Sequence, residues 1–180
     1  MSPRISPLPP AEWTEAAREV FSIIEGPKAR ENGTRFKIIL TLANYPDLAI
    51  PYLNFSKCLL KTSSLSDRIR EIVTLRVAHL YRSEYEWDQH VISAIRIGMT
   101  EAEIAAVKVG AAAIGWSDLE RQLLRAVDEL RADSTITDET WNALAAHLDQ
   151  RQLMDLLFTV GGYAMLAMFL NAAGVELEDS

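Results

Sequence analysis

The sequence contains one cysteine, Cys58, and three histidines among 180 residues. A single cysteine excludes an internal disulfide, a C-x-x-C redox pair and a zinc site built from cysteines. Because paired cysteines are common in oxidising compartments, we expect a cytoplasmic location. His79 and His147 have no ligand-type residues at metal-binding spacing, and no H-E-x-x-H pattern occurs. The composition therefore predicts no metal site.

Basic residues are few and dispersed, with 18 Lys and Arg against 25 Asp and Glu and a net charge of −7. Nucleic acids and anionic membranes are bound mainly through clustered Lys and Arg. We therefore expect neither nucleic acid nor membrane among the partners. Residues 1–10, MSPRISPLPP, are rich in proline and lack the basic-then-apolar pattern of a signal peptide, so we interpret them as an N-terminal arm.

One long apolar run, LLFTVGGYAMLAMFLNAAGV at residues 156–175, has no charged residue over the length of a bilayer span. Gly161, Gly162 and Asn171 lower its hydrophobicity, and only Arg151 flanks it closely. We interpret the run as a helix that is buried by its own domain or by a partner subunit. A homo-oligomer is therefore expected.

Hydrophobic periodicity elsewhere predicts helices joined by short turns, and no segment alternates as a half-buried strand would. Gly26 and Pro27 end the first helix, Ser66 can cap a later one, and Gly98 can end the helix that follows. The predicted helical segments are 11–25, 35–46, 47–60, 66–82, 84–97 and 135–148, with capping boxes at 100–103 and 117–120. The expected fold is all-α, a single-domain helical bundle over residues 11–180.

The stretch SEYEWDQH, residues 83–90, contains three carboxylates and one of the histidines. On a helix, Glu86 and His90 lie one turn apart on the same side. The preceding predicted helix is apolar nearly all round, so its charged residues Glu71 and Arg76 need partners. If the two helices pack antiparallel, Glu71 falls within a turn of His90. The pattern predicts a cluster of Glu71, Glu86 and His90.

Other interpretations of the same residues stay open. Ser83 to Glu86 also fits an S-x-x-E capping box, in which Glu86 would bond the amide of Ser83. A lone His90 could be a packed core histidine, and Trp87 is expected to pack. Arg76 is either the counter-ion of a buried carboxylate or a clamp for an anionic substrate.

The span LSDRIREIVTLRVAHLYRSEYEWDQHVISAIRIGMTEAEIAAV, residues 65–107, combines four features. An Arg-Glu pair opens an apolar helix, a polar-aromatic turn follows, a histidine comes 19 residues after the glutamate, and GMTEAEI closes the unit. Together they resemble the core of the carboxymuconolactone decarboxylase family, which includes the alkylhydroperoxidase D-like proteins. The resemblance implies an all-α trimer or hexamer whose interfaces are built from long helices.

In the peroxidase branch of that family, a Glu, a C-x-x-C pair and a His relay protons to a disulfide-forming pair. The resemblance places the Glu at Glu71 and the His at His90, with Ser83 and Glu86 at the cysteine positions. Peroxidase chemistry is not expected, because serine replaces a thiolate poorly and a carboxylate cannot form a disulfide. The resemblance implies instead the decarboxylase side of the family, with Glu71, Glu86 and His90 as acid and base groups and no cofactor.

The expected function is that of a cofactor-free lyase that decarboxylates a small oxygenated acid or lactone. Loss of CO₂ beside a carbonyl leaves an enolate-like carbanion, which a nearby acid must protonate. The residues expected to contact the substrate are Arg76, Arg68, Ser83 and Trp87. The alternatives are a peroxidase-like antioxidant, a metal-dependent hydrolase, and a non-catalytic binding protein, which a sealed His90 would favour.

Overall fold

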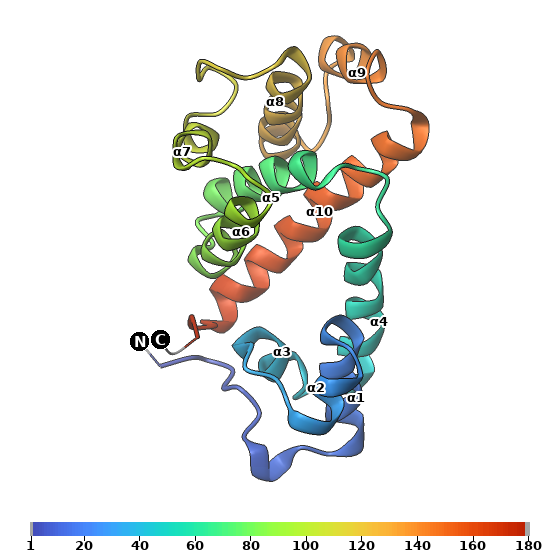
Figure 1. Ribbon diagram of the computed structural model, residues 1–180, viewed down its shortest axis with the longest axis vertical. Helices are drawn as coiled ribbons and strands as arrows, with labels where there is room; N and C mark the ends of the chain where they lie inside the picture. The colour runs from blue at the N-terminus through green and yellow to red at the C-terminus, as the bar shows by residue number, and fades with distance from the viewer. Residues whose placement is uncertain (1, 179–180) are drawn as a thin grey trace. The chain divides into compact units, whose positions relative to one another are not determined.

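The computed structural model describes residues 2–178, which form helices, turns and loops without a strand (Figure 1). The prediction of an all-α fold is confirmed. In chain order the elements are η1 (Pro10–Glu12), α1 (Glu15–Glu25), α2 (Pro27–Asn32), α3 (Lys37–Leu42), α4 (Pro46–Lys57), the π-helical turn η2 (Cys58–Thr62), α5 (Asp67–Tyr81), α6 (Glu84–Arg96), α7 (Glu101–Val109), α8 (Asp118–Asp133), α9 (Asp138–Ala145) and α10 (Gln150–Ala173).

The described residues group into two compact units. The first comprises residues 2–62 with 170–178, and the second comprises residues 63–169. The prediction of one folding domain over residues 11–180 stays a prediction. The predicted family core at residues 65–107 lies entirely within the second unit.

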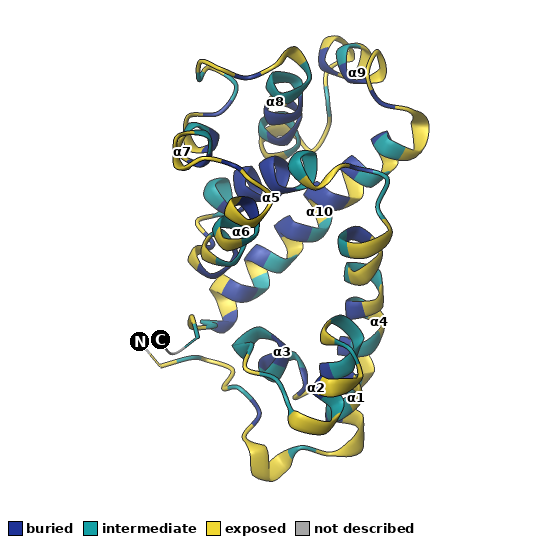
Figure 2. Ribbon diagram, in the orientation of Figure 1, coloured by how far each residue is buried: buried dark blue, intermediate teal, exposed yellow. Residues whose placement is uncertain are grey.

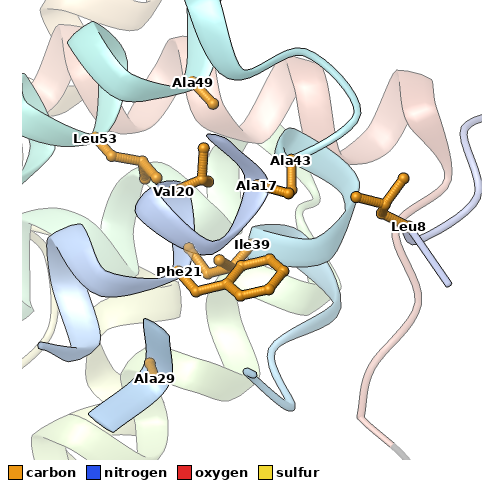
Figure 3. Packing of buried hydrophobic residues seen from close by; sticks show 9 residues of the cluster. All are labelled: Leu8, Ala17, Val20, Phe21, Ala29, Ile39, Ala43, Ala49 and Leu53. Carbon is orange, nitrogen blue, oxygen red and sulfur yellow. The ribbon is translucent and has the colours of Figure 1, made fainter. Parts of the chain in front are cut away.

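The first unit has its own hydrophobic core, built around α1. This helix begins at Glu15 rather than at residue 11, because the side chain of Thr14 accepts a hydrogen bond from the Ala17 amide and caps it. It ends at Gly26, whose φ of 88° favours glycine. Figure 3 shows the buried side chains of this core, which are Leu8, Ala17, Val20, Phe21, Ala29, Ile39, Ala43, Ala49 and Leu53.

The second unit is organised around α5, which is capped by Ser66 as predicted. Eight consecutive residues, 71–78, are buried, so α5 is covered on every side (Figure 2). Arg82 follows in the left-handed conformation, with φ 55° and ψ 38°. The chain reverses there and leads into α6.

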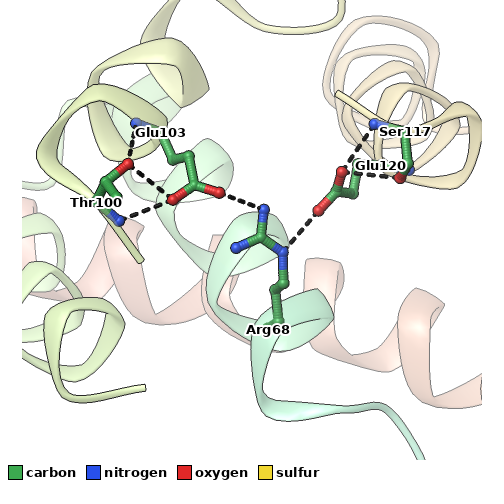
Figure 4. Close-up of polar contacts among 5 residues, drawn as sticks. All are labelled: Arg68, Thr100, Glu103, Ser117 and Glu120. Atoms are coloured by element: carbon green, nitrogen blue, oxygen red, sulfur yellow. Dashed lines mark hydrogen bonds and ion pairs between the residues drawn. The ribbon is translucent and has the colours of Figure 1, made fainter. Parts of the chain in front are cut away.

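The capping boxes predicted at the starts of α7 and α8 are both present, and Arg68 connects them (Figure 4). Glu103 and Glu120 each bond the first residue of their box, Thr100 and Ser117 respectively. The remaining oxygen of each glutamate lies 2.7 Å from the Arg68 guanidinium. One arginine on α5 therefore fixes the first turns of two other helices.

The helix α10 contains the long apolar run, and its most apolar window has a mean hydropathy of 1.8 with 44% of its residues buried. By length and composition it could cross a membrane, a test that core helices of soluble proteins also pass. Its residues within the second unit bury one face and expose another, which is apolar (Figure 2). The large exposed side chains are Met154, Leu157, Phe158, Met165 and Met168.

Candidate active site

A hydrogen bond between α5 and α6 joins two of the predicted site residues. Nδ1 of His90 lies 2.6 Å from Oε2 of Glu71, and both side chains belong to the second unit. The reversal at Arg82 makes this contact possible, and the Ser83 amide bonds the Ala78 carbonyl at 2.9 Å to fix it. The predicted pairing of Glu71 with His90 across antiparallel helices is thus present in the structure.

The environment of His90 leaves its second ring nitrogen available. Because Nδ1 donates to the Glu71 carboxylate, Nε2 is the atom left to exchange a proton, and no bond to it from residues 2–178 is seen. The ring packs edge-on against Tyr163 of α10, with centroids 5.0 Å apart and an interplanar angle of 87°. The His90 side chain keeps 13% of its exposure, so it is not sealed from solvent.

Glu86 is the most unusual residue of the cluster. It is 2% exposed, and neither carboxyl oxygen has a hydrogen-bond partner among residues 2–178. Burial raises its pKa from 4.5 to about 9, because an apolar surrounding disfavours the charged form. Glu86 is therefore a neutral carboxylic acid at pH 7.

The capping-box interpretation of Ser83 and Glu86 is wrong. No side chain caps α6, and the Glu86 carboxyl does not return to the Ser83 amide. Ser83 is itself 1% exposed, and its hydroxyl has no partner in the described part of the chain. The sequence pattern was correct for the start of the helix but not for the side chains, which point into the protein instead.

Two residues that sequence reasoning missed complete the cluster. Tyr163 of α10 is buried, and its pKa is raised by that burial and by the nearby carboxyls of Glu71 and Glu86, so its phenol stays protonated. Arg70 places a guanidinium nitrogen 3.6 Å from Oε1 of Glu71, and it also bonds Asp67 at 2.8 Å. The sequence offered one signal for each residue. Tyr163 is a tyrosine within the long apolar run, and Arg70 forms the Arg-Glu pair with Glu71.

The structure does not bring Arg76 to this cluster. Its guanidinium bonds both carboxyl oxygens of Asp128, at 2.7 and 2.9 Å, and the carbonyls of Val107 and Lys108 at 2.9 Å each. Its donors are engaged in these contacts, so it serves as the counter-ion of a carboxylate rather than as a substrate clamp.

Arg68 and Trp87 are also engaged away from the cluster. Arg68 links Glu103 and Glu120 at the starts of α7 and α8. Trp87 packs against the core of the second unit, and the Lys108 ammonium lies 4.5 Å from the centre of its ring. Of the four residues expected to contact substrate, Ser83 is the one that lies one turn before Glu86 at the start of α6 with a buried side chain.

No group of three or more His, Cys, Asp and Glu side chains within residues 2–178 is arranged to hold a metal ion. The side chains of the cluster include both a proton acceptor and a proton donor. A His90 nitrogen backed by Glu71 can accept and return a proton, and the neutral Glu86 can donate one. Base and acid stand one helical turn apart on α6.

Comparisons with known proteins show what this chain is similar to. Residues 46–129 match the model of the carboxymuconolactone decarboxylase family. An uncharacterised peroxidase-related protein from Ralstonia eutropha JMP134 with an alkylhydroperoxidase AhpD core is similar in structure, with a TM-score of 0.77, 20% identity and coverage of 97% of this chain and 93% of that one. Residues 46–129 are thus similar to the carboxymuconolactone decarboxylase family, and the fold is one that alkylhydroperoxidase D-like proteins share.

Two further solved structures have a similar fold. A putative antioxidant defence protein AhpD from Agrobacterium tumefaciens has a TM-score of 0.69 and 16% identity, and the match covers 76% of this chain and 94% of that one. The debrominase Bmp8, in a cysteine-to-alanine variant with 2,3,4-tribromopyrrole, has a TM-score of 0.79 and 16% identity over 99% of this chain and 93% of that one. At these identities the likeness establishes the fold alone. The comparison with curated proteins found no match.

This chain has no cysteine pair. Its single cysteine, Cys58, is exposed in the turn η2 and lies outside the Glu71 to His90 motif. The resemblance of residues 65–107 to the carboxymuconolactone decarboxylase family places Ser83 and Glu86 where the peroxidase motif has cysteines. The similarity to these proteins therefore extends to the fold, whereas the chemistry depends on the residues of this chain.

Proposed function

We propose that the protein is a cofactor-free lyase that decarboxylates a small oxygenated acid or lactone by acid and base catalysis. The observation that carries this proposal is the pairing of opposite groups in one cluster, a Glu71-backed histidine and a neutral carboxylic acid at Glu86. Enzymes that need an acid and a base at one pH obtain them by giving two titratable groups different environments. That condition is met here over a single turn of α6.

The proposed reaction breaks the bond between the substrate carboxylate and the adjacent carbon. CO₂ leaves, and the electron pair moves onto the neighbouring carbonyl oxygen as an enolate. A proton then adds to the carbon, and His90 Nε2 is the group placed to deliver it, because Nδ1 is held by Glu71. The histidine regains a proton from solvent, to which its side chain has access.

The experiment is a screen of lactone acids and β-keto acids for CO₂ release. We expect turnover with one of these classes, and a fall of roughly 10² or more in both Glu86→Gln and His90→Gln, the usual scale for a lost general acid or base. Matched controls are Glu84→Gln and His147→Gln, which change exposed residues of the same kinds. The double variant should cost less than the product of the singles, since groups that act together are not additive.

One observation favours a second candidate, a non-catalytic binding protein. Glu86 and Ser83 are almost completely buried, at 2% and 1% exposure, so a ligand reaches them only through a small opening or a movement of the chain. If no acid in the screen releases CO₂ while a small carbonyl compound binds, the binding protein is the correct description. Equal turnover in the wild type and in both site variants would contradict the catalytic proposal directly.

A further inference from the structure

A pocket in the second unit is formed by α5, α8 and α10. Its volume is about 180 Å³, and its lining includes no residue of α6 or of the candidate acid and base cluster. Val77, Val127 and Val160 line the pocket and are buried, whereas Arg131 and Ser134 line it and are exposed. The pocket therefore has an apolar interior and a polar mouth.

Arg131 supplies a positive charge at this mouth. Its guanidinium carbon lies 4.7 Å from the centre of the Tyr81 ring, and no carboxylate within residues 2–178 is paired with it. Asp128 and Glu129, the acidic residues nearest to it in the sequence of α8, bond Arg76 and the first turn of α9 instead. A contact with a ring restricts a guanidinium without using a hydrogen-bond acceptor, so the N–H donors are left for a carboxylate.

Gly161 of α10 forms part of the pocket wall. Glycine inside a helix is destabilising relative to alanine, so a packing reason is expected for it. Within the described chain none is found, because nothing lies within 4 Å of the position that a Cβ would occupy. The missing side chain leaves space at the pocket, which favours a ligand that approaches the backbone of α10 closely.

The size and the charge of the pocket define the class of ligand. Apolar cavities of roughly 150 Å³ accommodate benzene, so this pocket has room for a six-membered ring with one small substituent. One guanidinium balances one negative charge, and the net charge of −7 opposes the binding of a polyanion. The pocket thus suits a monoanion that carries an apolar ring.

We propose that this pocket is a binding site, in addition to the candidate active site, for a small aromatic carboxylate whose ring contacts the buried valines and whose carboxylate pairs with Arg131. The competing occupant is an apolar side chain of a second copy of the chain, because Leu157 belongs both to the pocket and to the exposed face of α10. The unpaired guanidinium favours the carboxylate, since an apolar side chain would cover this charge without a counter-charge.

The test compares benzoate with benzamide, which share a ring and nearly the same shape but differ in charge. Calorimetric titration of the full-length protein should show that benzoate binds about tenfold or more tightly, because only benzoate makes a charge-assisted pair with the guanidinium. Arg131→Gln should abolish this preference. Arg125→Gln is the matched control, because it changes another exposed arginine of α8 that does not line the pocket, and it should keep the preference.

A second variant, Gly161→Leu, fills the pocket and should abolish the binding of both probes. Its added side chain starts in open space, and leucine forms helices better than glycine, so the variant should unfold at no lower temperature than the wild type. His90→Gln should retain benzoate binding, because His90 does not line the pocket.

Equal affinity for the two probes in the wild type, or a benzoate preference that survives Arg131→Gln, would overturn the inference. Benzoate binding that is lost in His90→Gln would place the probe at the candidate active site and would overturn it as well. A wild type without the preference, together with a Gly161→Leu variant of lower mass by light scattering, would assign the pocket to a second copy of the chain instead.

Discussion

Glu71 holds His90 at 2.6 Å, whereas Glu86, one turn before His90 on the same helix, makes no hydrogen bond within residues 2–178. These two carboxyls, which both help to raise the pKa of Tyr163, thus have different environments. Glu71 faces the histidine nitrogen and the Arg70 guanidinium, and Glu86 faces an apolar interior. The burial of Glu86 predicts how the stability of the protein depends on pH.

The Glu86 carboxyl should make the protein less stable as the pH rises. Its pKa is about 9 when folded and near 4.5 when unfolded, so between these values the unfolded state releases a proton that the folded state keeps. The free energy of unfolding should therefore fall with pH across that window, with a slope of up to about 1.4 kcal/mol per pH unit. Glu86→Gln should remove this slope, measured by urea unfolding at several pH values.

Infrared spectroscopy tests whether the Glu86 carboxyl is protonated at pH 7. A protonated carboxyl gives a carbonyl band separate from the carboxylate bands, and this band should be present at pH 7 and absent in Glu86→Gln. Glu84→Gln, which changes an exposed residue of the same helix, should retain both the band and the slope. A wild type without the band would show that Glu86 is ionised and would remove the acid from the proposed site.

Arg68 should stabilise two helix starts together. Hydrogen bonds from Thr100 and the Arg68 guanidinium lower the pKa of Glu103 to about 2. The stability that this carboxylate contributes is present above its unfolded pKa near 4.5 and is lost as the pH falls toward 2. We expect Arg68→Ala to cost about 1 kcal/mol at neutral pH, less at high salt because the pair is partly exposed.

The dependence of stability on pH in the acid range distinguishes the loss of the Arg68 ion pairs from a simple loss of packing. Arg68→Ala should shift the acid unfolding midpoint, and Arg68→Lys should recover part of the loss, since lysine supplies charge but not the two-pronged contact. Arg70→Ala is not a suitable control because Arg70 lies at the site. Acid unfolding identical to the wild type in Arg68→Ala would contradict the role of the bridge seen in Figure 4.

Gly110 should tolerate no side chain. Its φ is +86°, and a Cβ there would lie 2.5 Å from the Arg76 guanidinium, which is fixed by Asp128. Gly110→Ala should therefore cost more than the roughly 1–3 kcal/mol of backbone strain alone. Gly98→Ala is the matched control, because its φ of +92° is similar but nothing lies within 4 Å of its Cβ. Equal losses in the two variants would show that Arg76 moves aside freely.

The apolar exposed face of α10 should be covered by another copy of the chain. Met154, Met165 and Met168 are about half exposed, and Asp155 is the single charged residue in the sequence between Met154 and Met168. We expect light scattering to give a mass above that of a monomer at micromolar concentration. Met165→Lys with Met168→Lys should lower that mass, whereas Ala132→Lys, at an exposed position near the end of α8, should not. A monomeric wild type would contradict the expected homo-oligomer.

The sequence was sufficient for features set by local periodicity. The burial of α5, the capping boxes of α7 and α8 and the contact of Glu71 with His90 all follow from helix geometry and from adjacent elements. Such features depend on residues within about 20 positions of each other in the sequence. The helical period is then sufficient to predict which of these residues lie on the same face or on adjacent helices.

Features that depend on distant packing were not predictable. Tyr163 reaches His90 from α10, and Asp128 reaches Arg76 from α8, and no local pattern indicates either partner. The side chain of Glu86 could cap its helix or turn inward with the same sequence, and the apolar surrounding that decides between them comes from other helices. Packing between distant helices therefore determines the chemistry of the site, whereas helix periodicity was sufficient to predict where the site lies.

The buried, unpartnered carboxyl of Glu86 also has an evolutionary consequence. A leucine or methionine at that position would fill similar space without the burden of an unsatisfied polar group, so random substitution alone would replace the glutamate over time. Lineages that still depend on the carboxyl should keep it even though it destabilises them. Among descendants of this chain, an apolar residue at position 86 would mark those in which the activity has been lost.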